Sequence, residues 1–245
     1  GVNSPARMAV DSVGRVYVSQ PKAGIVQQFD RTGKLLKNFS VPAAFALAVR
    51  KAGNVEQLVV VPNPVGKNLK PVDISELLVL DPATGEAAKP VKLSKTLRNA
   101  ITATTDATGN LYVLADVNQV YKFDAAGTLL TVLGAGTNSR AEDGSELLHS
   151  IAIDSKGNLY AMGFGNPGQV LRFDPALTTL TQRGGQFKFA DPWSTHSSYV
   201  SLAVDRTDRL WVGIHGHADP ASPNFDRYHP KPCVVRTNTD FFDPT

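Results

Sequence analysis

The stretch "SIAIDSKGNLYAMG", residues 150–163, consists of two runs of alternating apolar residues on either side of a polar turn. Alternation with a period of two is typical of a β-strand with one buried face. Gly157 and Asn158 tolerate the positive φ that a tight turn demands, so the stretch predicts an antiparallel hairpin. The pattern recurs along the chain as "RMAVDSVGRVYVSQ" (7–20), "ALAVRKAGNVEQLVVVP" (46–62), "ITATTDATGNLYVLAD" (101–116), "SIAIDSKGNLYAMG" (150–163) and "SLAVDRTDRLWVGI" (201–214).

A second hairpin follows each of these, with a first strand that ends in an aromatic residue or Leu plus Asp. The fifth version, "CVVRTNTDFFDPT" (233–245), stops where its last strand should be forming. The four complete versions are "GIVQQFDRTGKLLKNF" (24–39), "ELLVLDPATGEAAKPV" (76–91), "QVYKFDAAGTLLTVL" (119–133) and "QVLRFDPALTTLTQR" (169–183). Each repeat therefore predicts a four-stranded antiparallel sheet, with strands A to D in chain order.

Such sheets cannot cover their apolar faces alone, but radial stacking around a central axis can cover them, and this predicts an all-β fold, the β-propeller. A sandwich would not need such regular repetition, and no segment has a convincing helical period. We expect a single domain over residues 1–245, with five visible blades at roughly 5–41, 44–93, 99–133, 148–183 and 198–245. Ring closure is left open between the short stretch "GVNS" (1–4) and a sixth blade outside this chain.

Composition excludes some classes of binding partner and bears on the cellular compartment of the protein. The 25 Lys and Arg residues against 22 Asp and Glu leave a net charge of +3, and the basic residues are scattered, which gives no case for nucleic acid or an anionic membrane as partner. Cys233 is the only cysteine, so an intrachain disulfide and a Cys-rich zinc site are excluded. No apolar run is long enough to span a bilayer. Residue 1 is Gly rather than Met, so we expect a removed leader or a fragment, and an extracytoplasmic (periplasmic or secreted) location with the cytoplasm as alternative.

A resemblance to a known repeat follows from the residues around the turns. The pattern P-x-x-(apolar)-A-V-D-x-x-G-x-(apolar)-Y-V, followed by (apolar)-x-x-F-D-x-x-G, resembles the NHL repeat, a blade type of mostly six-bladed propellers. It is carried by Pro5, Ala9, Val10, Asp11, Gly14, Val16, Tyr17, Val18, Phe29, Asp30, Gly33, Asp154, Gly157, Asn158, Tyr160, Phe173 and Asp174. The second repeat departs from it, with Arg50 in place of Asp and a long insertion. The resemblance implies the fold, because NHL-like propellers serve as protein, RNA or ligand binders and in some cases as enzymes.

The longest connections should gather on one face. In a propeller the A-to-B and C-to-D turns lie on one face, and the B-to-C loops and D-to-A connections lie on the other. Every A-to-B and C-to-D turn is short in this sequence. The long segments are two B-to-C loops, 63–75 and 215–232, and two D-to-A connections, 134–150 and 184–198. Long loops on a rigid scaffold are where binding usually occurs, so this loop face is the predicted binding surface.

All five histidines belong to that face or its approach, together with several aromatic residues that could anchor a partner. The predicted binding residues are His149, Trp193, His196, His215, His217, Phe225, Tyr228 and His229. No catalytic residue is predicted. The repeated Asp residues of the turns are expected to accept backbone N–H bonds in their own turns rather than to bind calcium.

The histidines fit either a metal site or a polar loop whose histidines form surface hydrogen bonds, and the sequence favours the polar loop because no known ligand spacing is present. If a divalent metal is bound, its ligands are His149, His215 and His217. "LLHSIAID" (147–154) resembles inner-strand segments of the peptidylglycine amidating lyases, whose zinc is held by histidines at the heads of the innermost strands. The same position, five residues before the repeated Asp, is occupied by Ala6, Phe45, Ile101, His149 and Val200. A single histidine in this set argues against the same zinc site.

We therefore expect a non-catalytic binding or scaffold propeller that presents its loop-rich face to a protein partner or a larger assembly, with no resident cofactor. The alternative is a metal-dependent propeller enzyme of lyase or lactonase type, with a His-lined site at the mouth of the central channel.

Overall fold

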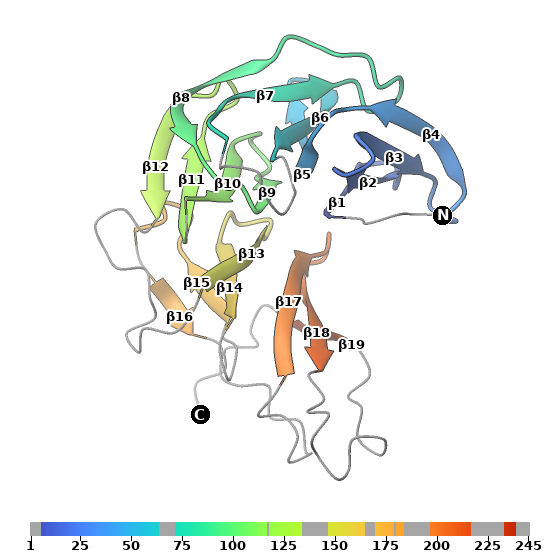
Figure 1. The fold of residues 1–245 in the computed structure, drawn as a ribbon. Coiled ribbons are helices and arrows are strands. Elements are labelled where there is room, and N and C mark those ends of the chain that lie inside the picture. Colours follow the sequence, from blue (N-terminus) through green and yellow to red (C-terminus); the bar gives the residue numbers. More distant parts are fainter. Residues whose placement is uncertain are drawn as a thin grey trace, which may run out of the picture. The chain divides into compact units, whose positions relative to one another are not determined.

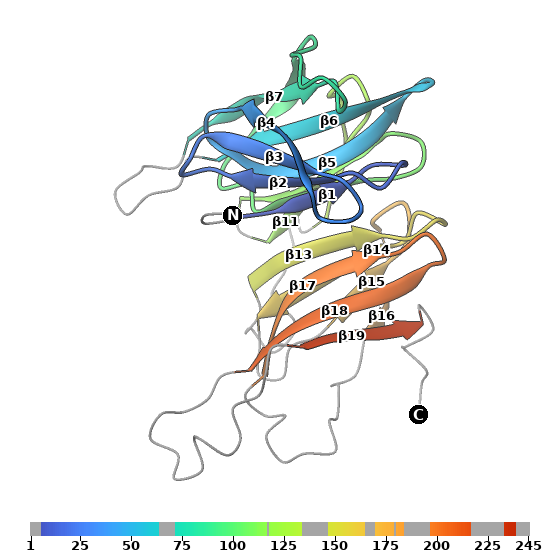
Figure 2. The same ribbon diagram turned by 90° about the vertical axis from the view of Figure 1, so that its right-hand side faces the viewer.

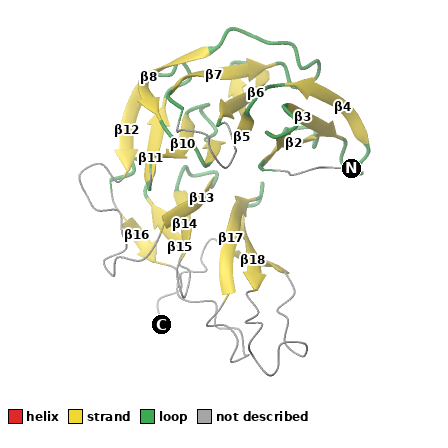
Figure 3. Ribbon diagram, in the orientation of Figure 1, coloured by secondary structure: helices red, strands yellow, loops and turns green. Residues whose placement is uncertain are grey.

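The computed structural model describes residues 6–63, 72–116, 118–133, 147–164, 170–178, 180–183, 197–216 and 233–238, and these residues form strands, turns and connections without any helix (Figures 1 and 3). The chain divides into two compact units, residues 1–133 and 134–245. Each unit is described by itself below. That all five repeats form one domain stays a prediction.

The first unit contains three four-stranded sheets. Their strands are β1 (Met8–Val10), β2 (Val16–Gln20), β3 (Ile25–Phe29) and β4 (Leu35–Ser40); β5 (Ala44–Ala52), β6 (Val55–Pro62), β7 (Ile74–Leu80) and β8 (Val91–Leu97); and β9 (Thr102–Thr105), β10 (Leu111–Ala115), β11 (Gln119–Phe123) and β12 (Leu129–Leu133). In this unit the strands β1, β5 and β9 lie on the inner side of the sheets, and β4, β8 and β12 lie on the outer side (Figure 1). We call the three sheets blades one to three.

The second unit contains blades four and five. Their strands are β13 (Leu147–Ile153), β14 (Leu159–Phe164), β15 (Val170–Phe173) and β16 (Leu180–Arg183), and β17 (Ser197–Val204), β18 (Arg209–Gly216) and β19 (Cys233–Asn238). Neighbouring strands are antiparallel and follow chain order in every sheet, as predicted from the repeats. Blade five has three strands within the described residues.

The apolar core lies between consecutive blades, which explains why the hairpin is repeated. In β6, Leu58 and Val60 pack toward blade one, whereas Val59 and Val61 pack toward blade three, and all four are fully buried. Alternate side chains of a strand point to opposite faces, so an unbroken apolar run is what a sheet buried on both faces requires. A third cluster joins blades four and five in the second unit, where Tyr160 packs with residues of β17 and β18.

The A-to-B turns have the predicted backbone. Gly14, Gly109 and Gly157 adopt φ of 85° to 86°, and Asp208 adopts φ of 56° at the matching position of blade five. Blade two differs because its strands pair up to Ala52 and Val55, so Arg50 lies inside the extended strand β5 instead of in a turn (Figure 2). The absence of Asp at this position thus accompanies a longer hairpin.

The C-to-D connection of blade two runs over residues 81–90, but Leu80 forms an antiparallel bridge with Ala87, so the turn itself is as short as predicted. The connection extends over blade one. The carbonyl oxygen of Pro82 accepts a hydrogen bond from Gln28 Nε2 (2.6 Å) and lies 2.7 Å from the Tyr17 hydroxyl oxygen, and the carbonyl of Thr84 accepts a hydrogen bond from Lys37 Nζ (2.6 Å). These bonds to blade one satisfy main-chain carbonyls of the connection.

Among the described residues, no helix could cross a membrane.

A serine after the repeated Asp links consecutive blades through a carboxylate. Ser12 donates its main-chain N–H and its hydroxyl to Glu56 of blade two, with the hydroxyl bond at 2.9 Å. Ser155 does the same to Asp208 of blade five, with the main-chain bond at 2.8 Å. Blade three has Ala107 at this position, which has no hydroxyl to donate.

We expect Ser155→Ala and Asp208→Asn to be coupled. The two side chains form a charge-assisted hydrogen bond at an exposed site, so a double-mutant cycle on urea unfolding should give a coupling free energy of about 0.5–1.5 kcal/mol. Ser12→Ala combined with Asp208→Asn is the matched control and should be additive, because these residues share no partner. Additivity in the first cycle would show that the link does not contribute to stability.

Candidate functional site

The inner strands of several blades begin with a β-bulge at the same position. In β5 the register shifts between Ala44 and Ala46, so Phe45 is the extra residue. The shifts in β13 and β17 leave His149 and Val200 as the extra residues. These are three of the five positions that precede the repeated Asp by five residues, and we call the five positions the strand heads: Ala6, Phe45, Ile101, His149 and Val200. Bulges re-aim a side chain and are common beside functional sites, so we take the strand heads of each unit as candidate site residues of that unit.

Arg7 brings together the three strand heads of the first unit. Its Nε donates to the Ile101 carbonyl at 2.8 Å, and its Nη1 donates to the Ala6 carbonyl at 2.9 Å. Its Cζ lies 5.4 Å from the centroid of the Phe45 ring, within the range of a cation–π contact. The guanidinium of blade one is therefore held against blade two and against blade three at once.

The main chain around Arg7 is held by the buried Ser19. The Arg7 N–H donates to Ser19 Oγ at 3.0 Å, and Ser19 Oγ donates to the carbonyl of Phe45 at 2.6 Å. Asn63, directly after β6 of blade two, donates from Nδ2 to the Ala100 carbonyl at 2.8 Å, beside the strand head of blade three. Side-chain hydrogen bonds thus tie the three heads of this unit into a fixed arrangement.

Arg7 has no anionic partner in the described part of the chain. It is half-buried, and burial lowers the pKa of Arg7 from its ordinary value. Two of its five N–H groups are used by carbonyls, and the described residues provide no acceptor for the others. A cation that is partly desolvated and not neutralised attracts an anion.

His149 is the strand head of blade four and is 9% exposed. Its Nδ1 lies 3.2 Å from the carbonyl oxygen of Met162, and a carbonyl can only accept, so Nδ1 carries the proton of this bond. The neighbouring Ser150 accepts the main-chain N–H of Leu202 at 2.9 Å, which joins the heads of blades four and five. His149 is therefore oriented by the strand beside it.

The other predicted binding residues are only partly placed by the structure. His215 lies near the end of β18, where its main chain pairs with Ser198, so it lies at the same end of its sheet as the strand head Val200. The remaining predicted residues lie outside the described residues: Trp193, His196, His217, Phe225, Tyr228 and His229.

Metal binding at the predicted histidines is not tested by the structure. Within the described ranges, no three His, Cys, Asp or Glu side chains lie close enough together to hold an ion. Of the predicted ligands His149, His215 and His217, only His149 has a described side chain. The metal set stays a prediction.

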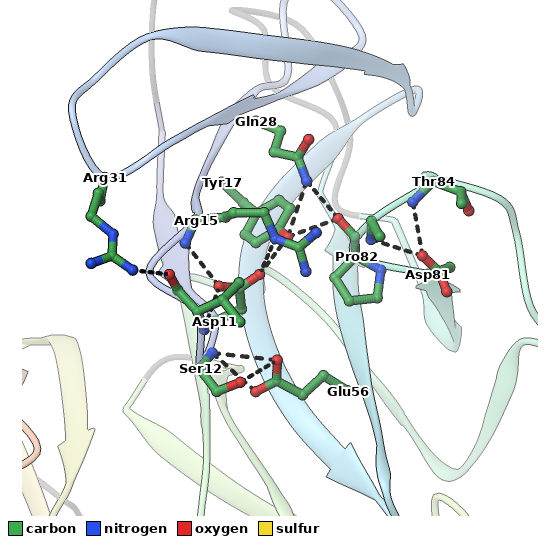
Figure 4. Close-up of polar contacts among 12 residues, drawn as sticks. Asp11, Ser12, Arg15, Tyr17, Gln28, Arg31, Glu56, Asp81, Pro82 and Thr84 are labelled. Atoms are coloured by element: carbon green, nitrogen blue, oxygen red, sulfur yellow. Dashed lines mark hydrogen bonds and ion pairs between the residues drawn. The ribbon is translucent and has the colours of Figure 1, made fainter.

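The repeated Asp residues at the opposite end of the inner strands are structural, as predicted. Asp11 Oδ1 accepts the N–H groups of Val13 (3.1 Å) and Arg15 (2.8 Å), and its Oδ2 accepts Arg15 Nε (2.5 Å) and the Tyr17 hydroxyl (2.9 Å) (Figure 4). We call this arrangement the Asp clamp. It recurs at Asp106 with Tyr112, at Asp154 with Tyr160 and at Asp205 with Trp211.

Hydrogen bonds favour the charged form of Asp11 in the clamp of blade one. Burial alone would raise the pKa of Asp11, but the hydrogen bonds from Arg15 and Tyr17 bring it below its usual value. Burial also raises the pKa of Tyr17 itself, so its hydroxyl stays a donor. All clamp oxygens are used within the blade, which leaves the clamps without the open coordination position that a binding site needs.

Sequence reasoning found the strand heads but missed Arg7. The offset from the repeated Asp identifies Ala6, whereas Arg7 is one residue later, and only its side chain reaches across the heads. A basic residue beside a strand head was the available signal, since the corresponding neighbours Ala46 and Thr102 are uncharged.

Comparisons with known proteins bear on the fold. No family model matches the chain, and no curated protein matches its sequence. Among solved structures, a protein of unknown function from Bacteroides caccae is 14% identical with a TM-score of 0.61, and the match covers 96% of this chain and 78% of that one. Virginiamycin B lyase from Staphylococcus aureus is 14% identical with a TM-score of 0.55, and the match covers 96% of this chain and 70% of that one. Such likenesses show the fold alone, and with the sheets described above they establish the all-β, β-propeller fold class predicted from the repeats.

Proposed function

We propose that this chain is a non-catalytic binding propeller that presents the strand heads, and the long loops at the same ends of its sheets, to a protein partner or a larger assembly. The observation that carries the proposal is Arg7, a fixed cation held over three strand heads by carbonyls rather than by a carboxylate. A rigid charged group in a half-buried position is suited to bind, because little side-chain entropy is lost when a partner arrives.

The blade type belongs to the same proposal. The Asp clamps place a carboxylate at the A-to-B turn and a Tyr or Trp six residues later, which supports the assignment of these blades to the NHL repeat. The extracytoplasmic location is supported by sequence reasoning alone, and fractionation of the source cells tests it.

Removal of the longest loop tests the binding proposal. Replacing residues 217–231 with a short Gly-Ser linker spares β18 and should abolish retention of a partner on immobilised protein, while the thermal unfolding midpoint changes little. The matched control is Val13→Ser with Arg31→Ala, at exposed turn positions of blade one, and it should retain the partner. The captured protein is then purified and its binding to both variants is measured directly. Unchanged binding by the loop variant would contradict the proposal.

The alternative, a metal-dependent enzyme of lyase or lactonase type, is favoured by one observation. Metal-ligating histidines commonly donate their second ring N–H to a carbonyl, and His149 makes such a bond to Met162 at a strand head. Virginiamycin B lyase shows that a lyase has this fold. A stoichiometric divalent metal in untagged protein, lost in His149→Ala, would favour this alternative over the binding proposal.

A further inference from the structure

We propose that Arg7 forms a subsite for a carboxylate group of the partner, at the strand heads of blades one to three. This inference rests on the proposed function and specifies the chemistry that the binding surface recognises. It depends on three properties of Arg7, which are its rigidity, its unneutralised charge and its remaining donors.

Rigidity comes from contacts on three sides of the guanidinium. The carbonyls of Ile101 and Ala6 fix Nε and Nη1, and the Phe45 ring lies against the planar group. The guanidinium presents its remaining N–H groups in one plane, and a carboxylate can accept two of them in parallel. The Arg side chain is thus organised for binding before the ligand arrives.

The charge of the site favours a carboxylate over a phosphate group. Arg7 provides a single positive charge, and within the described residues no carboxylate forms an ion pair with it. A carboxylate carries one negative charge and neutralises it, whereas a phosphate near neutral pH brings almost two. The surplus negative charge would remain partly desolvated, which is costly.

Arg50, in the same unit, is a structural arginine whose exposure and hydrogen bonds can be compared with those of Arg7. It is only 5% exposed, its Nε and Nη2 donate to Gln57 Oε1 at 3.0 and 2.9 Å, and its Nη1 donates to the Ala125 carbonyl at 2.8 Å. Every nitrogen of its guanidinium therefore has a protein acceptor. Arg7 is half-buried, and its Nη2 has no acceptor among the described residues, so the two arginines serve as a matched pair.

The test is a titration of uniformly arginine-labelled protein, in which the side-chain N–H signals of Arg7, Arg50 and the exposed Arg31 are followed by NMR. Sodium acetate should shift the Arg7 signals in a saturable manner with Kd of about 1–10 mM, while the other two arginines respond as they do to sodium chloride at equal ionic strength. Arg7→Gln should weaken acetate binding at least tenfold, and Arg31→Gln, which removes one exposed charge, should not. Arg7→Lys should also be weak, because it keeps the charge and loses the planar fork.

Either of two outcomes would overturn the inference. In the first, acetate shifts the N–H signals of Arg7 no more than those of Arg31. In the second, inorganic phosphate binds more tightly than acetate. The wild-type titration decides this even if Arg7→Gln fails to fold. Two short peptides then distinguish the source of the carboxylate: one has an internal Asp and an amidated C-terminus, and the other has no acidic side chain and a free C-terminus. Saturable binding of either supports the subsite, and binding of neither contradicts it.

Failure of this inference can be told apart from failure of the proposed function. Absent acetate binding with loss of the partner in the 217–231 variant would leave the binding function standing without a carboxylate subsite. Saturable acetate binding at Arg7 with full partner binding by that variant would support the carboxylate subsite and contradict the proposed role of the loop face in binding the partner.

Discussion

Replacing Gly127 with alanine should lower the free energy of unfolding by about 3–5 kcal/mol, whereas the same change at Gly33 should cost about 1 kcal/mol. Both glycines are at the same position of a C-to-D turn, with φ of 92° and 85°. The backbone strain of an L-residue is therefore common to both. They differ in their surroundings, because a Cβ on Gly127 would lie 2.1 Å from the Lys92 carbonyl oxygen, while nothing lies within 4 Å of one on Gly33.

The expected difference reflects how blade three contacts blade two. The carbonyl of Gly127 accepts the main-chain N–H of Ser94 at 2.9 Å, and Ser94 Oγ accepts the N–H of Leu129 at 2.8 Å. The turn is thus hydrogen-bonded to β8. An added methyl group on Gly127 would have to push the main chain of the turn away from the main chain of β8 at Lys92. Urea unfolding monitored by circular dichroism measures both variants, and equal losses would show that the close approach of the blades contributes nothing.

A second pair of glycines provides an independent check. Gly109 and Gly14 occupy the same position of an A-to-B turn with φ of 86° and 85°, but a Cβ on Gly109 would lie 2.5 Å from the Lys51 carbonyl oxygen, and one on Gly14 would be no closer than 3.8 Å to any atom. Gly109→Ala should again be the more destabilising change.

The repeats predict the blades because each strand can be recognised from its own residues. Alternation and turn residues identify strands locally, and a run such as Leu58 to Val61 shows that both faces of a sheet are covered. The same local reasoning does not reach contacts between blades. Residues 81–90 follow the pattern of a turn, but their own sequence does not show that the Pro82 carbonyl accepts a hydrogen bond from Gln28 of blade one.

The candidate site was less predictable than the fold. A fixed offset from the repeated Asp located the strand heads, because a bulge recurs when the surrounding strands recur. The role of Arg7 depends on the position of Ile101, ninety-four residues further along the chain, and no sequence period encodes that contact. Leu177 shows a similar limit: it adopts φ of 60° at a turn position that favours Gly, and it is only 5% exposed, so burial there outweighs the preference of the turn.

Removal of one Asp clamp should have the second large effect. Asp106 accepts hydrogen bonds from the N–H and hydroxyl of Thr108, from the N–H and Nδ2 of Asn110, and from the hydroxyl of the fully buried Tyr112 at 3.1 Å. Asp106→Ala leaves a buried hydroxyl without its acceptor and should cost about 3–5 kcal/mol. Asp124→Ala, in the C-to-D turn of the same blade, removes an exposed carboxylate that accepts the N–H groups of Ala126 and Thr128 and leaves no buried hydroxyl without its acceptor, so it should destabilise the protein much less.

The clamp also predicts how stability depends on pH. Burial alone would raise the pKa of Asp106, but hydrogen bonds from Thr108, Asn110 and Tyr112 bring it below its ordinary value. A carboxylate with a lowered pKa in the folded state contributes stability that is present above the pKa of the unfolded chain and is lost as pH falls through the folded value. Wild-type stability should therefore decline from about pH 4 downward, since an unfolded Asp titrates near there. Urea unfolding at pH 7, 4 and 3 measures this, and Asp106→Ala should lose less stability over that range than the wild type. An equal decline in both proteins would show that the charge of this carboxylate is not what stabilises the turn. Tyr112→Phe keeps the charge but removes one of the hydrogen bonds that lower the pKa of Asp106, so its pH dependence should lie between those of the wild type and Asp106→Ala.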